Sequence, residues 1–262
     1  MKVKNSQFLP GKPSDQDEMK EMQRKIARQA VFSDSTDYEP EEVEDMTVAG
    51  IDQAFTDEKS VSAAVALKDG EIIEEVSAAE KTPMPYTPGL LAFREGGAIV
   101  SALEKLEVEP DLLILDGSGR IHFRQAGIAT HIGVMFDVPA IGVAKNLLCG
   151  EVNLPEKMQE GDKRKIYADD SVENLDEGVL GYAYQSRQYS SPNRSINPLY
   201  ISPGHRLGPG TSVKIVSRFC KGYKLPEPTR IADRKVSELK ENTVDVVGFK
   251  KLSKNSLSIE GS

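Results

Sequence analysis

The sequence predicts a single α/β domain built on a mixed β-sheet. Three strand-like segments follow one another without an intervening helix, at residues 46–55, 60–67 and 71–78. Further along the chain, two short apolar segments at 112–115 and 140–144 alternate with helical patterns. Strands joined by short turns pair antiparallel, whereas strands separated by a helix usually pair in parallel. A chain of 262 residues, 39% of them hydrophobic, can bury one such sheet.

The N-terminal part is predicted to be an arm of residues 1–13 followed by a helix over 14–32. Ser14 and Asp17 have the spacing of a capping box. The helix carries an apolar stripe at helical spacing, formed by Met19, Met22, Ile26 and Ala30. The polar, Ser- and Lys-rich end of the chain predicts a flexible extension over 241–262, which leaves 14–240 as the main folded domain.

The three strand-like segments form a predicted antiparallel meander, because Lys68-Asp69-Gly70 is a hairpin signal between the second and third. A long helix is predicted next, from Thr87-Pro88 to about Leu106, because Thr suits the N-cap and Pro the first helical position. Later helices are predicted at 125–136, 211–220 and 231–239, with strands at 179–184 and 199–202. The stretch 150–196 is otherwise weakly patterned.

Composition leaves the function open but indicates the cellular environment of the protein. A net charge of −8 argues only weakly against nucleic-acid binding, because an enzyme with a carboxylate site needs no more than a local basic rim. Cys149 and Cys220 have no metal-type spacing and are expected to be free thiols. There is no apolar run of about 18 residues and no apolar leader. We therefore expect a cytoplasmic protein without a membrane span, and a monomer by default.

Three carboxylates have unusual surroundings. Asp52 lies inside an apolar strand, Asp116 ends another, and Glu95 interrupts the apolar stripe of a helix. A buried carboxylate is costly unless it is paired or bound to a cation. For Glu95 the alternative is an ordinary ion pair with Arg94 or Lys105. Three converging carboxylates suit a hard divalent ion such as Mg²⁺.

Four other side chains are candidates for chemistry. His122 and His205 each follow a short strand at a turn that contains glycine, a common place for catalytic groups, although most histidines are structural. Lys145 ends a buried strand and could place a positive charge beside a phosphate, or be a surface lysine. Tyr86 lies between two prolines and could stack on a base, or pack at a helix start. Zinc is not expected, because no paired His/Cys spacing occurs.

Taken together and in order, these motifs resemble the endonuclease V family. The resemblance covers roughly residues 15–240 and is strongest from 85 to 150. The segments that carry it are 48–52 (VAGID), 85–95 (PYTPGLLAFRE), 110–119 (PDLLILDGSG), His122, 127–131 (GIATH), 141–145 (IGVAK) and 202–206 (SPGHR).

The resemblance implies a ribonuclease H-like fold and a DNA repair activity. It implies hydrolysis of the second phosphodiester bond 3′ to deoxyinosine, leaving 3′-hydroxyl and 5′-phosphate ends, with Mg²⁺ or Mn²⁺. By position, Asp52, Glu95 and Asp116 would be the metal-binding carboxylates, and Lys145 and His205 would assist near the scissile phosphate. Tyr86 would be the wedge that fills the space of the displaced base. The hypoxanthine pocket would be lined by Gly89, Leu91, His122, Gly127 and Ile128.

Some positions depart from the family pattern, and two other functions stay open. Ser118 stands where the family often has His, Thr87 where it often has Ile, and the segment 185–197 looks different. Both inosine-containing RNA and inosine-containing DNA fit the motifs. A non-catalytic nucleic-acid-binding protein on the same fold is the third hypothesis, and the intact carboxylates argue against it.

Overall fold

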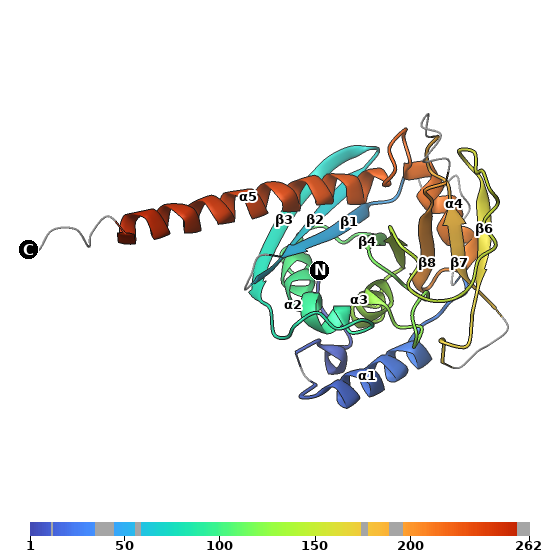
Figure 1. The fold of residues 1–262 in the computed structure, drawn as a ribbon, viewed down its shortest axis with the longest axis horizontal. Coiled ribbons are helices and arrows are strands. Elements are labelled where there is room, and N and C mark those ends of the chain that lie inside the picture. The colour runs from blue at the N-terminus through green and yellow to red at the C-terminus, as the bar shows by residue number, and fades with distance from the viewer. Residues whose placement is uncertain (12, 35–44, 56–58, 174–177, 189–195, 256–262) are drawn as a thin grey trace, which may run out of the picture.

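The computed structural model describes residues 1–11, 13–34, 45–55, 59–173, 178–188 and 196–255, and beyond residue 241 it describes the backbone alone. One sheet dominates it, with the strand order β3-β2-β1-β4-β5-β8-β7-β6 (Figure 1). The strands are β1 (Val48–Phe55), β2 (Lys59–Lys68), β3 (Glu71–Lys81), β4 (Leu112–Asp116), β5 (Ala140–Ala144), β6 (Lys163–Tyr167), β7 (Val179–Tyr184) and β8 (Leu199–His205). The helices are η1 (Ser6–Phe8), α1 (Gln16–Gln29), α2 (Leu91–Leu103), α3 (Ile128–Phe136), α4 (Pro209–Phe219) and α5 (Glu227–Asn255).

The predicted mixed sheet and its antiparallel meander are confirmed. β1, β2 and β3 pair antiparallel, β1, β4 and β5 pair in parallel, and β8, β7 and β6 add an antiparallel half. The carboxyl ends of the three parallel strands therefore share one edge of the sheet. Ile51 pairs with Leu115, so the residues that follow them, Asp52 and Asp116, lie side by side at that edge.

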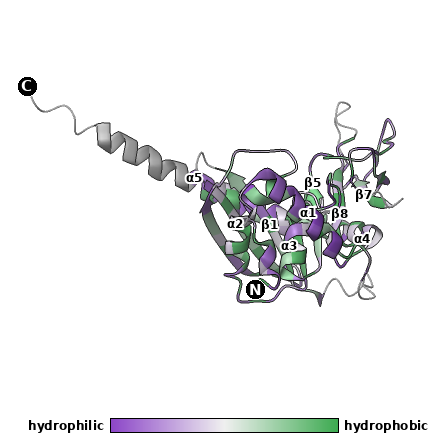
Figure 2. Ribbon diagram, turned by 90° about the horizontal axis from the view of Figure 1, so that it is seen from below, coloured by the Kyte–Doolittle hydropathy of each residue, from purple (hydrophilic) through white to green (hydrophobic). Residues whose placement is uncertain are grey.

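Helices cover both faces of the sheet because the central strands are apolar on both sides. On one face, Ala49, Ile51 and Leu113 pack into a core with α1, α2 and α3. On the other, Val48 and Ile114 pack against α4. All nine residues of α3 are buried, whereas α1 buries only two side chains, and Figure 2 shows α3 in green and α1 mainly in purple. α3 therefore lies between α1 and the sheet.

α5 lies on β1 and β2 because β1 offers it a position without a side chain. A Cβ on Gly50 would come within 2.1 Å of the carbonyl carbon of Pro228, in the first turn of α5. Ile231 and Ala232 then pack against Val65 of β2. These contacts of α5 with β1 and β2 fix the rotation of the helix about its axis. That rotation determines the direction in which the side chain of the next residue, Asp233, extends.

Several predicted boundaries differ from the structure; the helix predicted over 231–239, for example, spans Glu227–Asn255. α1 is capped by Asp15, whose side chain accepts from two backbone N–H groups, while Ser14 bonds instead to Glu18. α2 begins at Leu91 rather than near Thr87, because Gly89 has a φ of +76° and the segment before it forms a turn. Strand β6 was not predicted. β8 continues three residues past the predicted end, to His205.

The structure of the two terminal segments can be compared with the predicted domain boundaries at residues 13 and 240. The amino group of Met1 donates to the Leu106 carbonyl at 2.6 Å, and Phe8 is buried, so the predicted arm packs against the domain. α5 passes residue 240 without a break, so the boundary predicted there lies inside a helix. Residues 189–195 of the segment 185–197 are outside the described residues. Among the described helices, none has the length and apolar content that a membrane crossing requires.

A candidate metal centre beside a pocket

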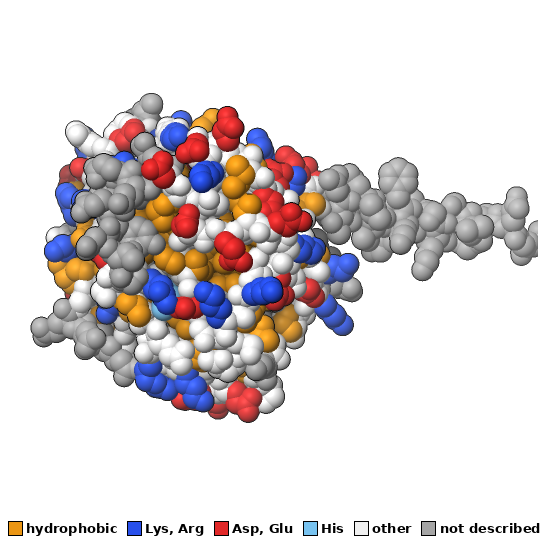
Figure 3. Space-filling model, turned by 180° about the vertical axis from the view of Figure 1, so that it is seen from behind, with side chains coloured by type: hydrophobic (Ala, Val, Ile, Leu, Met, Phe, Trp, Pro, Cys, Tyr) orange, Lys and Arg blue, Asp and Glu red, His pale blue; other side chains and the backbone are white. Residues whose placement is uncertain are grey.

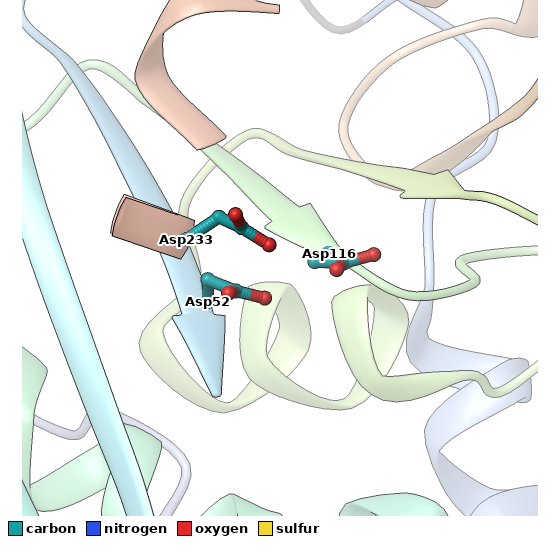
Figure 4. Close-up of side chains that lie close together, drawn as sticks. All are labelled: Asp52, Asp116 and Asp233. Carbon is teal, nitrogen blue, oxygen red and sulfur yellow. The ribbon is translucent and has the colours of Figure 1, made fainter. Parts of the chain in front are cut away.

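Three carboxylates from three separate elements meet at the carboxyl edge of the parallel strands. Asp52 of β1, Asp116 of β4 and Asp233 of α5 each place one carboxylate oxygen so that the three lie within 4.8 Å of one another. Figure 4 shows the side chains of the two strands and the helix approaching a common point. Asp52 and Asp116 were predicted here, whereas Asp233 was not.

The carboxylates crowd negative charge into a partly buried space. Burial first, and the neighbouring charge of Asp116 second, raise the pKa of Asp52 to about 8. Lys145 opposes this crowding, with its ammonium 3.0 Å from an oxygen of Asp116 and 3.4 Å from one of Asp233. One lysine offsets only part of the charge of three carboxylates. Oxygen ligands gathered in this way fit a hard divalent cation.

Glu95 of α2 is a further buried carboxylate whose charge interacts with that of Asp116, although it is not one of the three whose oxygens lie within 4.8 Å of one another. Its side chain is buried, and burial together with the charge of Asp116 raises its pKa to about 8, against an opposing effect of Arg94. Its Oε2 atom has no hydrogen-bond partner in the described part of the chain. The ion pair considered as an alternative is not formed with Lys105, which donates to the Ser77 carbonyl instead. A buried carboxylate oxygen without a partner beside an acidic cluster fits a bound cation.

A pocket of about 320 Å³ opens directly beside this cluster. Asp116 and Lys145 form part of its wall, so the pocket and the carboxylates share one space. All six residues predicted to contact the base line the same pocket: Tyr86, Gly89, Leu91, His122, Gly127 and Ile128. The structure therefore places the predicted base-contacting residues beside Asp116 of the carboxylate cluster.

The loop at Gly89 is held by three donors to one carbonyl. The side chains of Gln23, His122 and Arg124 donate to the Gly89 oxygen at 2.8, 3.0 and 3.2 Å. His122 Nδ1 accepts from the backbone N–H of Arg124, so the ring proton is on Nε2. Burial lowers the pKa of His122 to about 4, which keeps the ring neutral at pH 7. His122 therefore holds the pocket wall in place through its hydrogen bond to the Gly89 carbonyl.

Tyr86 is the exposed aromatic side chain at the pocket. It is 61% exposed, so its ring is available to a base rather than packed into the domain. The guanidinium of Arg94 lies 4.0 Å from the ring centre of Phe55 and 5.9 Å from that of Tyr86.

His205 lies away from this site, at the other end of β5, and not near the scissile phosphate as predicted. It pairs with Ala140 at the start of β5, whereas Asp116 pairs with Val143 near its end, roughly 10 Å further along the strand. Its Nδ1 accepts from the Val31 N–H and its Nε2 lies 3.3 Å from Asp137. The histidine therefore joins elements at the opposite edge of the sheet.

The surface charge is mixed in sign despite the net charge of −8. Figure 3 shows Lys and Arg side chains interspersed with Asp and Glu on one face of the molecule. A net acidic composition therefore still leaves basic side chains on the surface of the molecule.

Comparison with known proteins identifies the family. The sequence profile of Endonuclease V matches residues 25–234. Endonuclease V of Haloarcula marismortui is 53% identical over 259 residues, which cover 89% of this chain and 96% of that protein. Endonuclease V of Halobacterium salinarum is 48% identical, over 91% of this chain and all of that protein.

Solved structures agree with the sequence comparison. The crystal structure of Endonuclease V from Bacillus subtilis has a TM-score of 0.78 and 27% identity, covering 94% of this chain and 99% of that one. Ciona intestinalis Endonuclease V, solved in complex with a 24mer DNA containing an inosine followed by a ribo-adenosine, has a TM-score of 0.68 and 27% identity, covering 86% and 97%. The predicted ribonuclease H-like fold is thereby confirmed. The chain belongs to the endonuclease V family of nucleases.

Proposed function

We propose that this protein is a divalent-metal-dependent endonuclease that cuts DNA at the second phosphodiester bond 3′ to deoxyinosine, leaving 3′-hydroxyl and 5′-phosphate ends. The observation that carries the proposal is a carboxylate cluster that shares its space with a pocket lined by all six base-contacting residues expected from the sequence. A relative of this chain was crystallised with inosine-containing DNA, which supports the same choice of substrate.

Four carboxylates, from Asp52, Glu95, Asp116 and Asp233, would hold Mg²⁺ or Mn²⁺. Such a cation, when bound, supplies activation of water and stabilisation of the charge that develops on the phosphate oxygens. Because the same cation would compete with Lys145 for Asp116 and Asp233, the Lys145 ammonium becomes free to contact a phosphate oxygen. The chain itself therefore provides negatively charged ligands for the cation and one positively charged group, the Lys145 ammonium, for the substrate.

The pocket would distinguish hypoxanthine from adenine at one edge of the base. Hypoxanthine carries an oxygen where adenine carries an amino group, so a backbone N–H in the first turn of α3, such as that of Ile128, can donate to one and not to the other. A mispaired base also costs less to move out of the helix than a paired one. Tyr86, exposed at the pocket, would occupy the space that the displaced base leaves.

The test is a 5′-labelled duplex with one central deoxyinosine, incubated with and without Mg²⁺ beside an identical adenine duplex. We expect one Mg²⁺-dependent product that ends one nucleotide beyond inosine on its 3′ side. Equal cutting of the adenine duplex would contradict the assigned pocket, and cutting in the presence of a chelator would contradict the assigned metal centre.

Inosine-containing RNA is the second candidate substrate, because the DNA bound to the Ciona intestinalis relative has a ribonucleotide directly after the inosine. Matched strands that differ only in the sugar of the nucleotide after inosine separate the two. A rate on the ribonucleotide strand at least tenfold above that on the all-DNA strand would assign the protein to RNA. A non-catalytic binding role would be indicated by binding to both strands without cleavage of either.

A further inference from the structure

Lys224 lies in the loop that joins α4 to α5, and two anchors fix its place. Ser186 Oγ donates to the Lys224 carbonyl at 2.6 Å. The Lys224 ammonium donates to the side-chain oxygen of Asn197. Ser186 follows the end of β7 and Asn197 precedes the start of β8, so both anchors belong to the sheet edge where those two strands meet. The side chain is half-buried rather than extended into solvent.

That position is on the same edge of the sheet as the metal centre. Ala144 pairs with Tyr200, so Lys145 emerges from β5 opposite Leu199, two residues after Asn197. From the spacing of strands and of residues along them, Asn197 is on the order of 10 Å from Lys145. Lys224 is therefore a second cation beside the carboxylate cluster, displaced from it toward β7 and β8.

The two lysines differ in their partners. Lys145 has a carboxylate oxygen within 3.4 Å on both Asp116 and Asp233. Lys224 makes no ion pair with any carboxylate in the described ranges, and its ammonium is bonded to a neutral amide. Burial and the charge of Lys145 both lower the pKa of Lys224, as expected for a cation that lacks an anion. Within the part of the chain that the structure describes, one of its three N–H donors is used, so two are left for a ligand.

We infer that Lys224 binds a backbone phosphate next to the scissile one, on the β7–β8 side of the metal centre. This inference rests on the proposed function and extends it to the path of the strand. The bound strand leaves the pocket past Lys145 and continues along the sheet edge to Lys224. A phosphate there supplies the missing counter-charge, and the Asn197 contact holds the ammonium in place for it. The contact reads no base, so it contributes equally to strands of any sequence.

The experiment measures binding of fluorescent single strands by anisotropy, one with deoxyinosine and one with adenine in its place, at several KCl concentrations in Mg²⁺. All proteins carry Asp52→Asn so that the strands stay intact. Lys224→Gln removes the charge, and Lys224→Met is a second uncharged variant that keeps the aliphatic stem. Lys224→Arg restores a cation. Lys221→Gln, an exposed lysine of the same loop, is the matched control, and thermal unfolding checks that each variant is folded.

We expect Lys224→Gln and Lys224→Met to make the slope of log K against log[KCl] shallower by about 0.7, the value for one phosphate contact on a single strand. Both oligonucleotides should lose affinity by the same factor, while Lys224→Arg and Lys221→Gln keep the original slope. An unchanged slope in both uncharged variants overturns the role of Lys224 and leaves the proposed function intact. A loss restricted to the inosine strand also overturns it, because a phosphate contact reads no base. Absence of any binding by the parent protein to either strand overturns the inference about Lys224, while the duplex cleavage test decides the proposed function separately.

Discussion

Replacing Glu95 with glutamine is expected to stabilise the metal-free protein at neutral pH. Burial raises the pKa of Glu95 from its ordinary value of 4.5 to about 8, so below pH 8 the folded protein keeps this carboxyl protonated. The unfolded chain ionises the same group above pH 4.5. The folded state therefore binds more protons than the unfolded state, and stability falls as pH rises from about 4.5 to about 8.

The size of this effect follows from the pKa difference. Each factor of ten in proton affinity is worth about 1.4 kcal/mol, so at pH 7.5 the cost approaches roughly 4 kcal/mol and at pH 5 it is less than about 1 kcal/mol. Glutamine carries no charge at either pH, although its amide also lacks buried partners. We therefore expect a net gain of about 2–4 kcal/mol at pH 7.5, or at least about 4 °C in Tm for a chain of this size.

The assay is thermal unfolding of wild type and Glu95→Gln in a chelator at pH 5 and pH 7.5, with Glu104→Gln as the control. Glu104 ends the same helix but is exposed, so its replacement should shift Tm by less than about 1 °C. Adding Mg²⁺ should raise the Tm of wild type more than that of Glu95→Gln, because the variant has lost one carboxylate. A Glu95→Gln protein no more stable than wild type at pH 7.5, or equally more stable at both pH values, would refute the reasoning.

Two further substitutions, at Gly50 and at His205, test the packing of α5 on β1 and the distance of His205 from the metal centre. Gly50→Ala should lower stability by about 1–3 kcal/mol and slow cleavage at least tenfold, because the new methyl group displaces Pro228 and with it α5. Gly97→Ala is the control, because its new Cβ would meet no atom within 4 Å, and it should leave the cleavage rate unchanged and the stability unchanged or slightly higher. If Gly50→Ala and Gly97→Ala had equal effects in thermal unfolding and in cleavage assays, this explanation would be contradicted. His205→Gln should lower Tm while leaving the cleavage rate within about twofold, since His205 contacts Asp137 at the opposite edge of the sheet. A hundredfold slower rate in a folded variant would return His205 to the catalytic site.

Sequence pattern located the site because parallel strands deliver their last residues to one edge. Asp116 ends one apolar strand and Asp52 lies inside another, and the parallel pairing of these two strands places the two residues side by side. Glu95 was found by a different signal, an acid inside the apolar stripe of a helix, and its burial explains why that signal was informative. These three residues could be predicted because each stands out from the apolar pattern of its own segment of the sequence.

His205 was misplaced because its strand runs the other way. Sequence shows that a residue follows a strand, but not whether the strand is parallel or antiparallel to its neighbours. β8 pairs antiparallel with β5, so its carboxyl end lies at the edge where β5 begins. A residue in the turn after β4 therefore lies at the metal centre, whereas a residue in the turn after β8 lies at the opposite edge of the sheet.

Asp233 and β6 were missed because their local sequences resemble surface segments. Asp233 lies between Ala232 and Arg234 on a helix rich in charge, and only the packing of Pro228 on Gly50 turns it toward the carboxylates. β6 begins with three exposed charged side chains at the edge of the sheet, a composition that edge strands use and that lacks apolar alternation. Both features depend on contacts between distant parts of the chain.

The most direct test of the metal centre uses Asp233→Asn, since Asp233 is assigned by the structure alone. Single-turnover cleavage of the deoxyinosine duplex is measured across a range of Mg²⁺ concentrations, with Glu238→Gln as the control on the exposed side of the same helix. We predict that Asp233→Asn cleaves at least tenfold more slowly and needs more Mg²⁺ for its half-maximal rate, while Glu238→Gln matches wild type. Wild-type rates for Asp233→Asn at every Mg²⁺ concentration would contradict the assignment of these carboxylates to one metal centre.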